Sequence, residues 1–319
     1  MAAAPDTDPD PRIHVTAPGL QRLAGPARGL RFTPNQPARS LLNGRHGSRL
    51  RGRGLAFEEL RDYVDGDDIR TIDWKVTART GTPHVRVYSE ERDRPTLLLI
   101  DQRVSMFFGS RVYMKSVIAA EAAALAAHAI LGQGDRVGGL VFSDTRIAEH
   151  RPQRSAAALS RLLASVARAN QALSSDLQAP EPLALDQVLR AARRIVATGG
   201  LVLVFSDFHT LSPESESHIR ALARHNDLLL FQVADPLIRQ MPDGTRLPIS
   251  DAQRQAELDF TTRAQREAVS AFFATRLDAL RDWSRRYNAP LLPLGTEEPA
   301  IDQLRRLMGL AAPRAGARR

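Results

Sequence analysis

Short apolar runs alternate with helical patterns along most of this chain, and this alternation limits the possible folds more than any other feature. The runs are TLLLID, RVGGLVF, LVLVFSD and DLLLFQVAD. Helical patterns lie between them, including an Ala-rich segment over 113–131 and an amphipathic one over 185–197. Strands joined by helices form a parallel sheet that is covered on both faces, and right-handed crossovers make it doubly wound. We therefore predict an α/β fold with a doubly wound, mostly parallel, Rossmann-like sheet.

The remaining segments complete this layout. Residues RIAEH, after an SDT turn, predict a short edge strand, and APLLPL predicts a last strand. Helices are expected over 155–169, over 261–287, over 299–308 and from the SPESE stretch, where Ser212 can cap the helix and Pro213 can occupy its first turn. The segment MPDGTRLPISDAQRQAELDF predicts a surface hairpin that turns at PDG.

Composition divides the chain into four parts. Residues 1–27 are rich in Pro, Ala, Asp and Gly without periodicity, so disorder is expected there. Residues 28–94 carry many charges of both signs and are predicted to be an N-terminal extension packed on the domain. Residues 95–310 form the predicted α/β domain, and 311–319 a basic disordered tail.

The bulk composition excludes several classes of protein. The chain has no cysteine, which excludes a disulfide scaffold and a cysteine-based zinc site. Its first residues hold Pro and Asp where a signal peptide needs an apolar core, and its apolar runs are shorter than a membrane span. We expect a cytoplasmic protein without membrane insertion. The net charge is +8, but the arginines are dispersed and few aromatic residues lie among them, so no nucleic-acid partner is expected.

Two predicted strands end in an aspartate, Asp101 and Asp207. In doubly wound sheets the functional crevice lies at the carboxyl ends of the strands. A phosphotransfer aspartate of the haloacid dehalogenase type needs a second Asp two residues later, where this chain has Arg103. A receiver-type site needs a paired carboxylate, and Asp101 is followed by Gln102.

A metal-site pattern fits these residues better. The stretch LLLIDQRVSMFFG resembles the first motif of the metal-ion-dependent adhesion site of von Willebrand factor A domains, and LVLVFSDFHT resembles its third. The candidate Mg²⁺ ligands are Asp101, Ser105 and Asp207. Arg103 stands where the motif has its first serine, and Leu183 stands where it has a distant threonine. A guanidinium neutralises carboxylates by bidentate pairing, so we favour substitution of Arg103 for the ion over a working metal site. A solvent-facing Arg103 is the third alternative.

The charged block upstream predicts its own local structure. Phe57, Leu60 and Val64 fall on one face of a predicted short helix, whereas IRTIDW and HVRVYSE look extended. The DGDD run lacks the spacing of a calcium loop. Arginines and acidic residues throughout the block can form a structural ion-pair network.

The same block carries a resemblance to a known family. The pattern RGRG, then GDDIR and IDW, then EER before LLLID, resembles the bacterial domain-of-unknown-function 58 family over about 41–310. The residues that carry this resemblance are Arg53, Asp67, Asp68, Arg70, Asp73 and Trp74. The resemblance implies a von Willebrand factor A-like fold and a role as adaptor for MoxR-type AAA+ ATPases, which are typically encoded beside these proteins. No enzymatic activity is established for the family.

We therefore expect a non-enzymatic interaction module without a cofactor. Its partner would be a MoxR-type AAA+ ATPase or the client of that ATPase, bound at a crevice formed by Asp101, Arg103, Ser105 and Asp207. Three alternatives remain open: adhesion-type binding through an intact Mg²⁺ site, a Mg²⁺-dependent hydrolase with His209 as the nearest base, and a basic nucleic-acid binder, whose affinity would fall steeply with salt.

Overall fold

The computed structural model describes residues 9–32, 56–64, 72–89, 94–175, 177, 182–196, 198–238, 246–250, 255–259 and 262–310. These residues divide into two compact units. The larger unit lies within 1–46 and 94–319, and the smaller one lies within 47–93.

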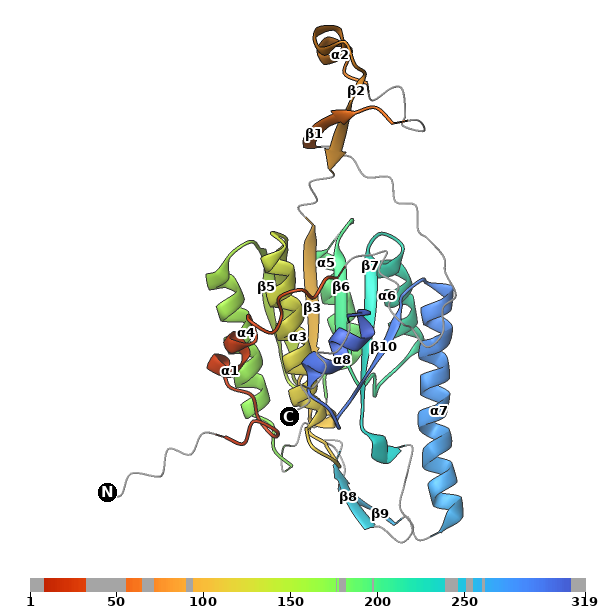
Figure 1. Cartoon of the computed structure of the whole chain (residues 1–319). Helices are drawn as coiled ribbons and strands as arrows, with labels where there is room; N and C mark the ends of the chain where they lie inside the picture. Colours follow the sequence, from red (N-terminus) through yellow and green to blue (C-terminus); the bar gives the residue numbers. More distant parts are fainter. Residues whose placement is uncertain are drawn as a thin grey trace, which may run out of the picture. The chain divides into compact units, whose positions relative to one another are not determined.

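The larger unit is built on a six-stranded sheet (Figure 1). Its order is β10-β7-β6-β3-β4-β5, and every neighbouring pair is parallel except β4–β5. The strands are β3 (Pro95–Asp101), β4 (Arg136–Phe142), β5 (Ile147–Gln153), β6 (Leu201–Ser206), β7 (Asp227–Ala234) and β10 (Leu291–Gly295). The prediction of a doubly wound, mostly parallel α/β sheet is confirmed, including the edge strand β5.

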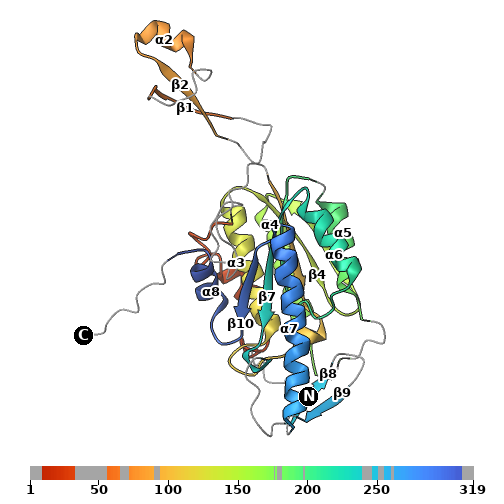
Figure 2. The same ribbon diagram turned by 90° about the vertical axis from the view of Figure 1, so that its right-hand side faces the viewer.

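Helices cover both faces of this sheet (Figures 1 and 2). On one face pack α1 (Ala17–Arg22), α3 (Lys115–Gly132), α4 (Ala156–Gln171) and α8 (Ala300–Leu307). On the other face pack α5 (Leu185–Ile195), α6 (Pro213–Ala223) and α7 (Arg263–Arg286). Ser212 caps α6 with Pro213 at its first position, as the sequence predicts. Two 3₁₀ turns, η2 (Val104–Met106) and η3 (Pro236–Ile238), follow β3 and β7.

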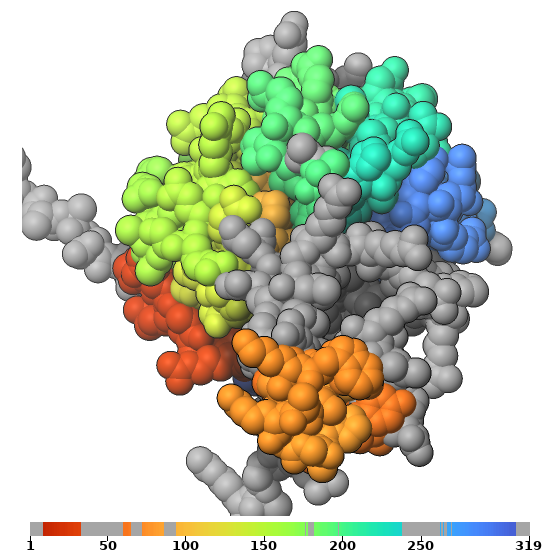
Figure 3. Space-filling view, turned by 90° about the horizontal axis from the view of Figure 1, so that it is seen from above, coloured from red at the N-terminus to blue at the C-terminus, as the bar shows by residue number. Residues whose placement is uncertain are grey.

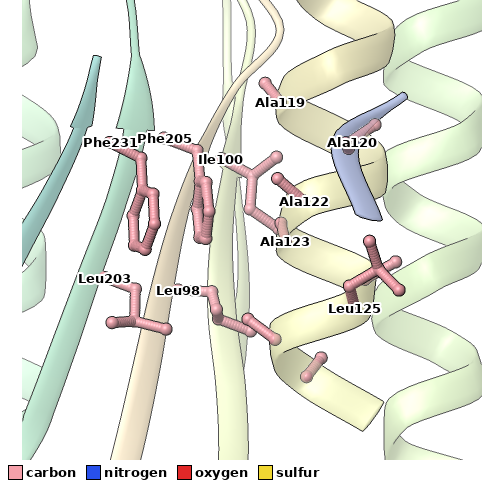
Figure 4. Close-up of a cluster of buried hydrophobic side chains, with 14 of the residues drawn as sticks. Leu98, Ile100, Ala119, Ala120, Ala122, Ala123, Leu125, Leu203, Phe205 and Phe231 are labelled. Carbon is pink, nitrogen blue, oxygen red and sulfur yellow. The ribbon is translucent and has the colours of Figure 1, made fainter. Parts of the chain in front are cut away.

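Helix α3 is the centre of the core on its face of the sheet. Its alanines let it approach the sheet closely, and they pack against Ile100, Leu203 and Phe205 (Figure 4). Among the described residues α3 is the one helix long and apolar enough to cross a membrane by length and composition alone, and 78% of it is buried in this domain.

The prediction of disorder over 1–27 is wrong for residues 9–27. This segment contains α1, which is capped by Thr16, and α1 contacts α4 (Figure 3). Val15, Leu20 and Phe32 are buried in the same core as α3. Their irregular spacing gives no helical or strand period, which is why the sequence did not show that they pack. Residues 28–32 therefore belong to the larger unit rather than to the charged extension, and residues 1–8 and 311–319 lie outside the described residues.

The smaller unit contains β1 (Ala56–Asp62), α2 (Trp74–Thr80) and β2 (His84–Ser89), with β1 and β2 antiparallel. The predicted helix through Phe57, Leu60 and Val64 is wrong, because that segment pairs with β2 as a strand. IDW was predicted to be extended, but Asp73 caps a helix that starts at Trp74.

The predicted surface hairpin is present as β8 (Arg246–Ser250) and β9 (Gln255–Asp259), which pair antiparallel. Residues 251–254 connect its two strands, whereas the PDG of 242–244 precedes both strands and lies outside the described residues. The turn signal was therefore assigned to the wrong end of β8.

Candidate functional site

The candidate site lies at the carboxyl ends of β3 and β6, which are neighbours in the middle of the sheet. The chain runs from β3 outward to β4 and β5 on one side, and later returns to β6 on the other side. This is the topological switch point at which doubly wound folds form a crevice. Asp101 is the last residue of β3, Ser206 is the last residue of β6, and Asp207 follows it.

Arg103 turns back onto Asp101 and pairs with it through two parallel hydrogen bonds. Nε donates to Oδ1 at 3.0 Å and Nη2 donates to Oδ2 at 2.7 Å. The Arg103 backbone N–H also donates to Oδ1, and the Ser206 hydroxyl donates to Oδ2 at 2.6 Å. Both residues are almost completely buried, at 0% and 3% exposure for Asp101 and Arg103. The carboxylate of Asp101 is therefore fully engaged by the protein itself.

The same guanidinium holds two further loops. Its Nη1 donates to the backbone carbonyl of Leu183 at 3.3 Å and to the hydroxyl of Thr210 at 3.1 Å. Its plane also lies over the ring of Phe142, 5.4 Å from the centroid. Burial by itself lowers the pKa of Arg103, but the nearby carboxylates, Asp101 foremost, raise that pKa to a net value above its ordinary one. Arg103 is thus a permanent buried cation that ties together the loops after β3, before α5 and after β6.

Asp207 has a different counter-charge, Lys115 at the start of α3. Lys115 Nζ lies 2.7 Å from Asp207 Oδ2, and both side chains are less than one-tenth exposed. Burial works to raise the pKa of Asp207, but Lys115 and the other nearby cations outweigh it and the pKa falls below its ordinary value. The two strand-end aspartates therefore each have a cation of their own, whereas the sequence led us to expect that Arg103 would serve both.

A third buried carboxylate, Asp144, completes the crevice. It lies on the turn between β4 and β5, and its Oδ2 accepts the backbone N–H of Val104 at 2.7 Å. Its backbone carbonyl accepts the N–H of Leu183. Burial raises the pKa of Asp144, and the Val104 N–H and Arg103 only partly offset that effect. Asp144 thus fixes the loop after β3 to the β4–β5 turn.

The turn after β6 has an unusual backbone. Phe208 has φ of 53°, in the left-handed region that a bulky residue rarely adopts, and its side chain is buried. Its N–H donates to the Ser206 hydroxyl, while the His209 N–H donates to Asp207 Oδ1. These two bonds hold the strained turn and aim Asp207 at Lys115. The ring of His209 instead faces Arg276 of α7, at 3.2 Å.

The geometry does not suit a divalent cation. Mg²⁺ needs oxygen ligands that are free to point at it, but Asp101 and Asp207 are already bound by a guanidinium and an ammonium. Ser105 Oγ is buried without a hydrogen-bond partner among the described residues, so one proposed ligand is unengaged. The described residues contain no group of three or more His, Asp or Glu side chains that could hold a metal. The Ser105 hydroxyl alone cannot bind Mg²⁺, because the buried cations of Arg103 and Lys115 already neutralise the two aspartates and would repel the ion.

The residues of the family pattern lie in the other unit. Asp73 is buried, and its Oδ1 accepts the N–H groups of Lys75 and Val76 at the start of α2. Trp74 is 65% exposed within this unit. Arg53, Asp67, Asp68 and Arg70 lie outside the described residues.

Sequence reasoning missed four residues of the crevice: Lys115, Asp144, Ser206 and Thr210. Asp144 follows the end of β4 within two residues, so the signal used for Asp101 and Asp207 could have found it. Ser206 directly precedes Asp207 and matches the Ser-Asp of the third adhesion-site motif. Lys115 and Thr210 gave no local signal, because their roles depend on how α3 and the β6 loop pack.

Comparison with known proteins identifies the family. Residues 59–279 match the family described as "Protein of unknown function DUF58". The chain is 31% identical over 302 residues to the uncharacterized protein Rv1480 of Mycobacterium tuberculosis, covering 93% of this chain and 91% of that protein. The uncharacterized protein Mb1516 of Mycobacterium bovis matches to the same extent.

Two solved structures are also similar. The conserved hypothetical protein BatB of Bacteroides thetaiotaomicron aligns with a TM-score of 0.35 and 11% identity, over 60% of this chain and 98% of that one. An aerotolerance-related membrane protein of Bacteroides fragilis aligns with a TM-score of 0.38 and 12% identity, over 66% of this chain and 95% of that one. Likenesses this distant support no inference about activity. The match to the family and the full-length relatives do decide the classification: this chain belongs to the DUF58 family.

Proposed function

We propose that this protein is a non-enzymatic interaction module that acts with a MoxR-type AAA+ ATPase through the surface around the strand-end crevice. The observation that carries this proposal is the buried pairing of Arg103 with Asp101. In a metal-dependent adhesion site the ion joins the loops. Here a covalently attached cation joins them, so the loops are fixed without any ligand. A surface that is fixed before binding loses less conformational entropy when a partner docks.

The state of the acidic groups supports an adaptor over a hydrolase. Asp101 and Asp207 are each held in an ion pair, and Asp144 receives a backbone N–H. A general base has to be within reach of a substrate and free to accept its proton. His209 lies two residues after Asp207 and is the nearest histidine to it in sequence. Its ring contacts Arg276, however, and burial lowers its pKa. The crevice therefore supplies rigidity more readily than proton transfer.

The partner would meet the rim of the crevice, since the charged groups lie beneath it. Arg111, Val112 and Thr210 are exposed on loops at this edge of the sheet, with Val112 at 45%. The backbone N–H of Val112 donates to Thr296 after β10, which ties this rim loop to the sheet. An exposed apolar side chain on an anchored loop is a suitable contact for a partner protein.

Co-purification with a MoxR-type ATPase from the same organism tests the proposal. The wild-type chain is expected to retain the ATPase, and Val112→Glu is expected to lose most of it. Leu310→Glu is the matched control, because Leu310 is 37% exposed and lies after α8. Failure of the wild type to retain the ATPase, or equal loss in both variants, would contradict the proposed role of this edge.

A further inference from the structure

A second candidate site lies beside the β4–β5 turn, which also carries Asp144 of the crevice. It is a cavity of about 240 Å³ between that hairpin and α4. Its wall is formed by Ser143, Arg146, Ser165, Arg168 and Ala169, together with apolar residues of β4 and β5. Figure 1 shows α4 lying beside β5 at this edge of the sheet.

The polar groups of this cavity are cationic or hydroxylic. Arg146 and Arg168 both line it, with Ser143 and the buried Ser165, and no acidic residue is among the described residues that form its wall. Arg168 donates to Ser165 Oγ at 3.0 Å, and neither arginine has a carboxylate partner within the described part of the chain. By contrast, Arg286 on the other face of the sheet pairs with both Glu216 and Asp282.

The surroundings of the cavity are positive as well. His150 on β5 shares the Ser165 hydroxyl with Arg168, with its Nε2 2.9 Å from that oxygen. Burial lowers the pKa of His150, and Arg161 and Arg168 lower it further. Two guanidinium groups beside the imidazole leave positive charge that no carboxylate among the described residues pairs with. A cluster of guanidinium and hydroxyl donors of this kind favours an anion.

The cavity is physically connected to the crevice. Ser143 and Arg146 close the turn through a Ser143 N–H to Arg146 carbonyl bond, and Asp144 of the crevice lies between them. On α4, Asn170 follows the cavity residue Ala169 and donates to Gln102, the neighbour of Asp101. A ligand in the cavity would therefore contact the two elements that also position the loop after β3.

We propose that this cavity binds a single oxyanion group, a phosphate or a carboxylate, through the guanidinium groups of Arg146 and Arg168. Its volume is below the range of sites that enclose a whole drug-sized molecule, so it suits one charged group of a larger ligand. Guanidinium groups pair with phosphate and carboxylate oxygens in the same two-pronged geometry. The Ser143 hydroxyl supplies a further donor at the turn.

An NMR titration of the deuterated, ¹⁵N-labelled full chain tests this site. Inorganic phosphate and sodium acetate are added separately at constant ionic strength, with sodium chloride as the reference. The amides of Ser143, Arg146, Ser165 and Arg168 are expected to shift and saturate with at least one of the two oxyanions. Phosphate binding at least tenfold tighter than acetate would identify a phosphorylated ligand, and comparable affinities would identify an acidic side chain of a protein.

Charge-removing variants show whether the cavity itself is responsible. Arg146→Gln and Arg168→Gln are each expected to weaken binding at least tenfold. Arg224→Gln, at an exposed position after α6, removes the same charge elsewhere and is expected to change affinity less than twofold. Shifts that do not saturate, that chloride reproduces, or that all three variants reduce equally would overturn the proposal. This result does not depend on whether an ATPase binds at the crevice.

Discussion

Arg103 binds both carboxylate oxygens of Asp101, which lies only two residues earlier in the chain, and neither residue is accessible to solvent to more than 3%. A pair this close in sequence costs little chain entropy to form. A buried ion pair is stable only when its remaining donors and acceptors are satisfied. Here Ser206, Thr210 and the Leu183 carbonyl satisfy them, and each comes from a different loop or strand end.

Removing the cation of this pair should be costly. Arg103→Met leaves Asp101 buried without its counter-charge, and we expect the free energy of unfolding to fall by about 3–5 kcal/mol. Urea denaturation measures this change. In the double variant Arg103→Met/Asp101→Asn no buried charge is left unpaired, so much of the loss should be recovered. Arg151→Met is the control, because the Arg151–Glu149 pair is largely exposed and should contribute little. If Arg103→Met and Arg151→Met reduced the free energy of unfolding equally, the role of Arg103 as a buried counter-charge would be contradicted.

The pairing of Lys115 with Asp207 should behave as a second, separate unit. Lys115→Met is expected to reduce the free energy of unfolding by about 3 kcal/mol, since it leaves Asp207 buried beside a strained turn. Adding Asp207→Asn should restore part of it, whereas adding Asp101→Asn should not. A double-mutant cycle between Lys115 and Asp207 measures the coupling directly. A coupling energy near zero would show that the two side chains do not stabilise each other.

The low pKa of Asp207 predicts a dependence of stability on acid. Burial opposes ionisation, but Lys115 and its neighbours hold the folded pKa below the ordinary value of about 4. The stabilisation is therefore present above that ordinary value and is lost as the pH falls from about 4 through the folded pKa. Wild-type stability should fall more steeply below pH 4 than that of Asp207→Asn. Parallel curves from urea unfolding at each pH would contradict this assignment.

Glu121 on α3 should make the stability depend on pH in the opposite direction to Asp207. Burial raises its pKa from 4.5 to about 7, so the folded protein holds a proton that the unfolded chain releases. Stability should therefore decrease as the pH rises from about 4.5 to about 7, and a rise of this size corresponds to about 3 kcal/mol. Glu121→Gln should stabilise the protein by up to about that amount at pH 8 and by much less at pH 5. Glu149→Gln on β5 serves as the control, and a gain independent of pH would contradict the prediction.

Most of the sheet could be predicted from the sequence, because a strand that is buried on both faces is a continuous apolar run, such as LVLVF. A strand or helix at the surface would instead alternate apolar with polar residues. The sequence also placed Asp101 and Asp207 at one edge, since the carboxyl ends of parallel strands meet there. A periodic pattern over only a few residues gave a wrong prediction of secondary structure. Phe57, Leu60 and Val64 share a helical face by spacing alone, yet their segment pairs with β2.

Long-range partners were harder to predict than elements. Lys115 is the counter-charge of Asp207 across 92 positions, and nothing in the Ala-rich pattern around it indicates that contact. Residues 9–32 pack into the core through a few scattered side chains, which have no period to detect. In both cases tertiary packing decides the outcome, and a single sequence carries little signal for it.

A calorimetric titration of the wild-type protein with Mg²⁺, with Asp101→Asn as the control, tests most directly whether Arg103 is the built-in cation of the crevice. If the guanidinium of Arg103 occupies the place of an ion at the strand ends, neither protein should show saturable Mg²⁺ binding. Saturable binding by the wild type that Asp101→Asn abolishes would show that the carboxylate of Asp101 is available to a metal, and it would contradict the role of Arg103 as the built-in cation of the crevice.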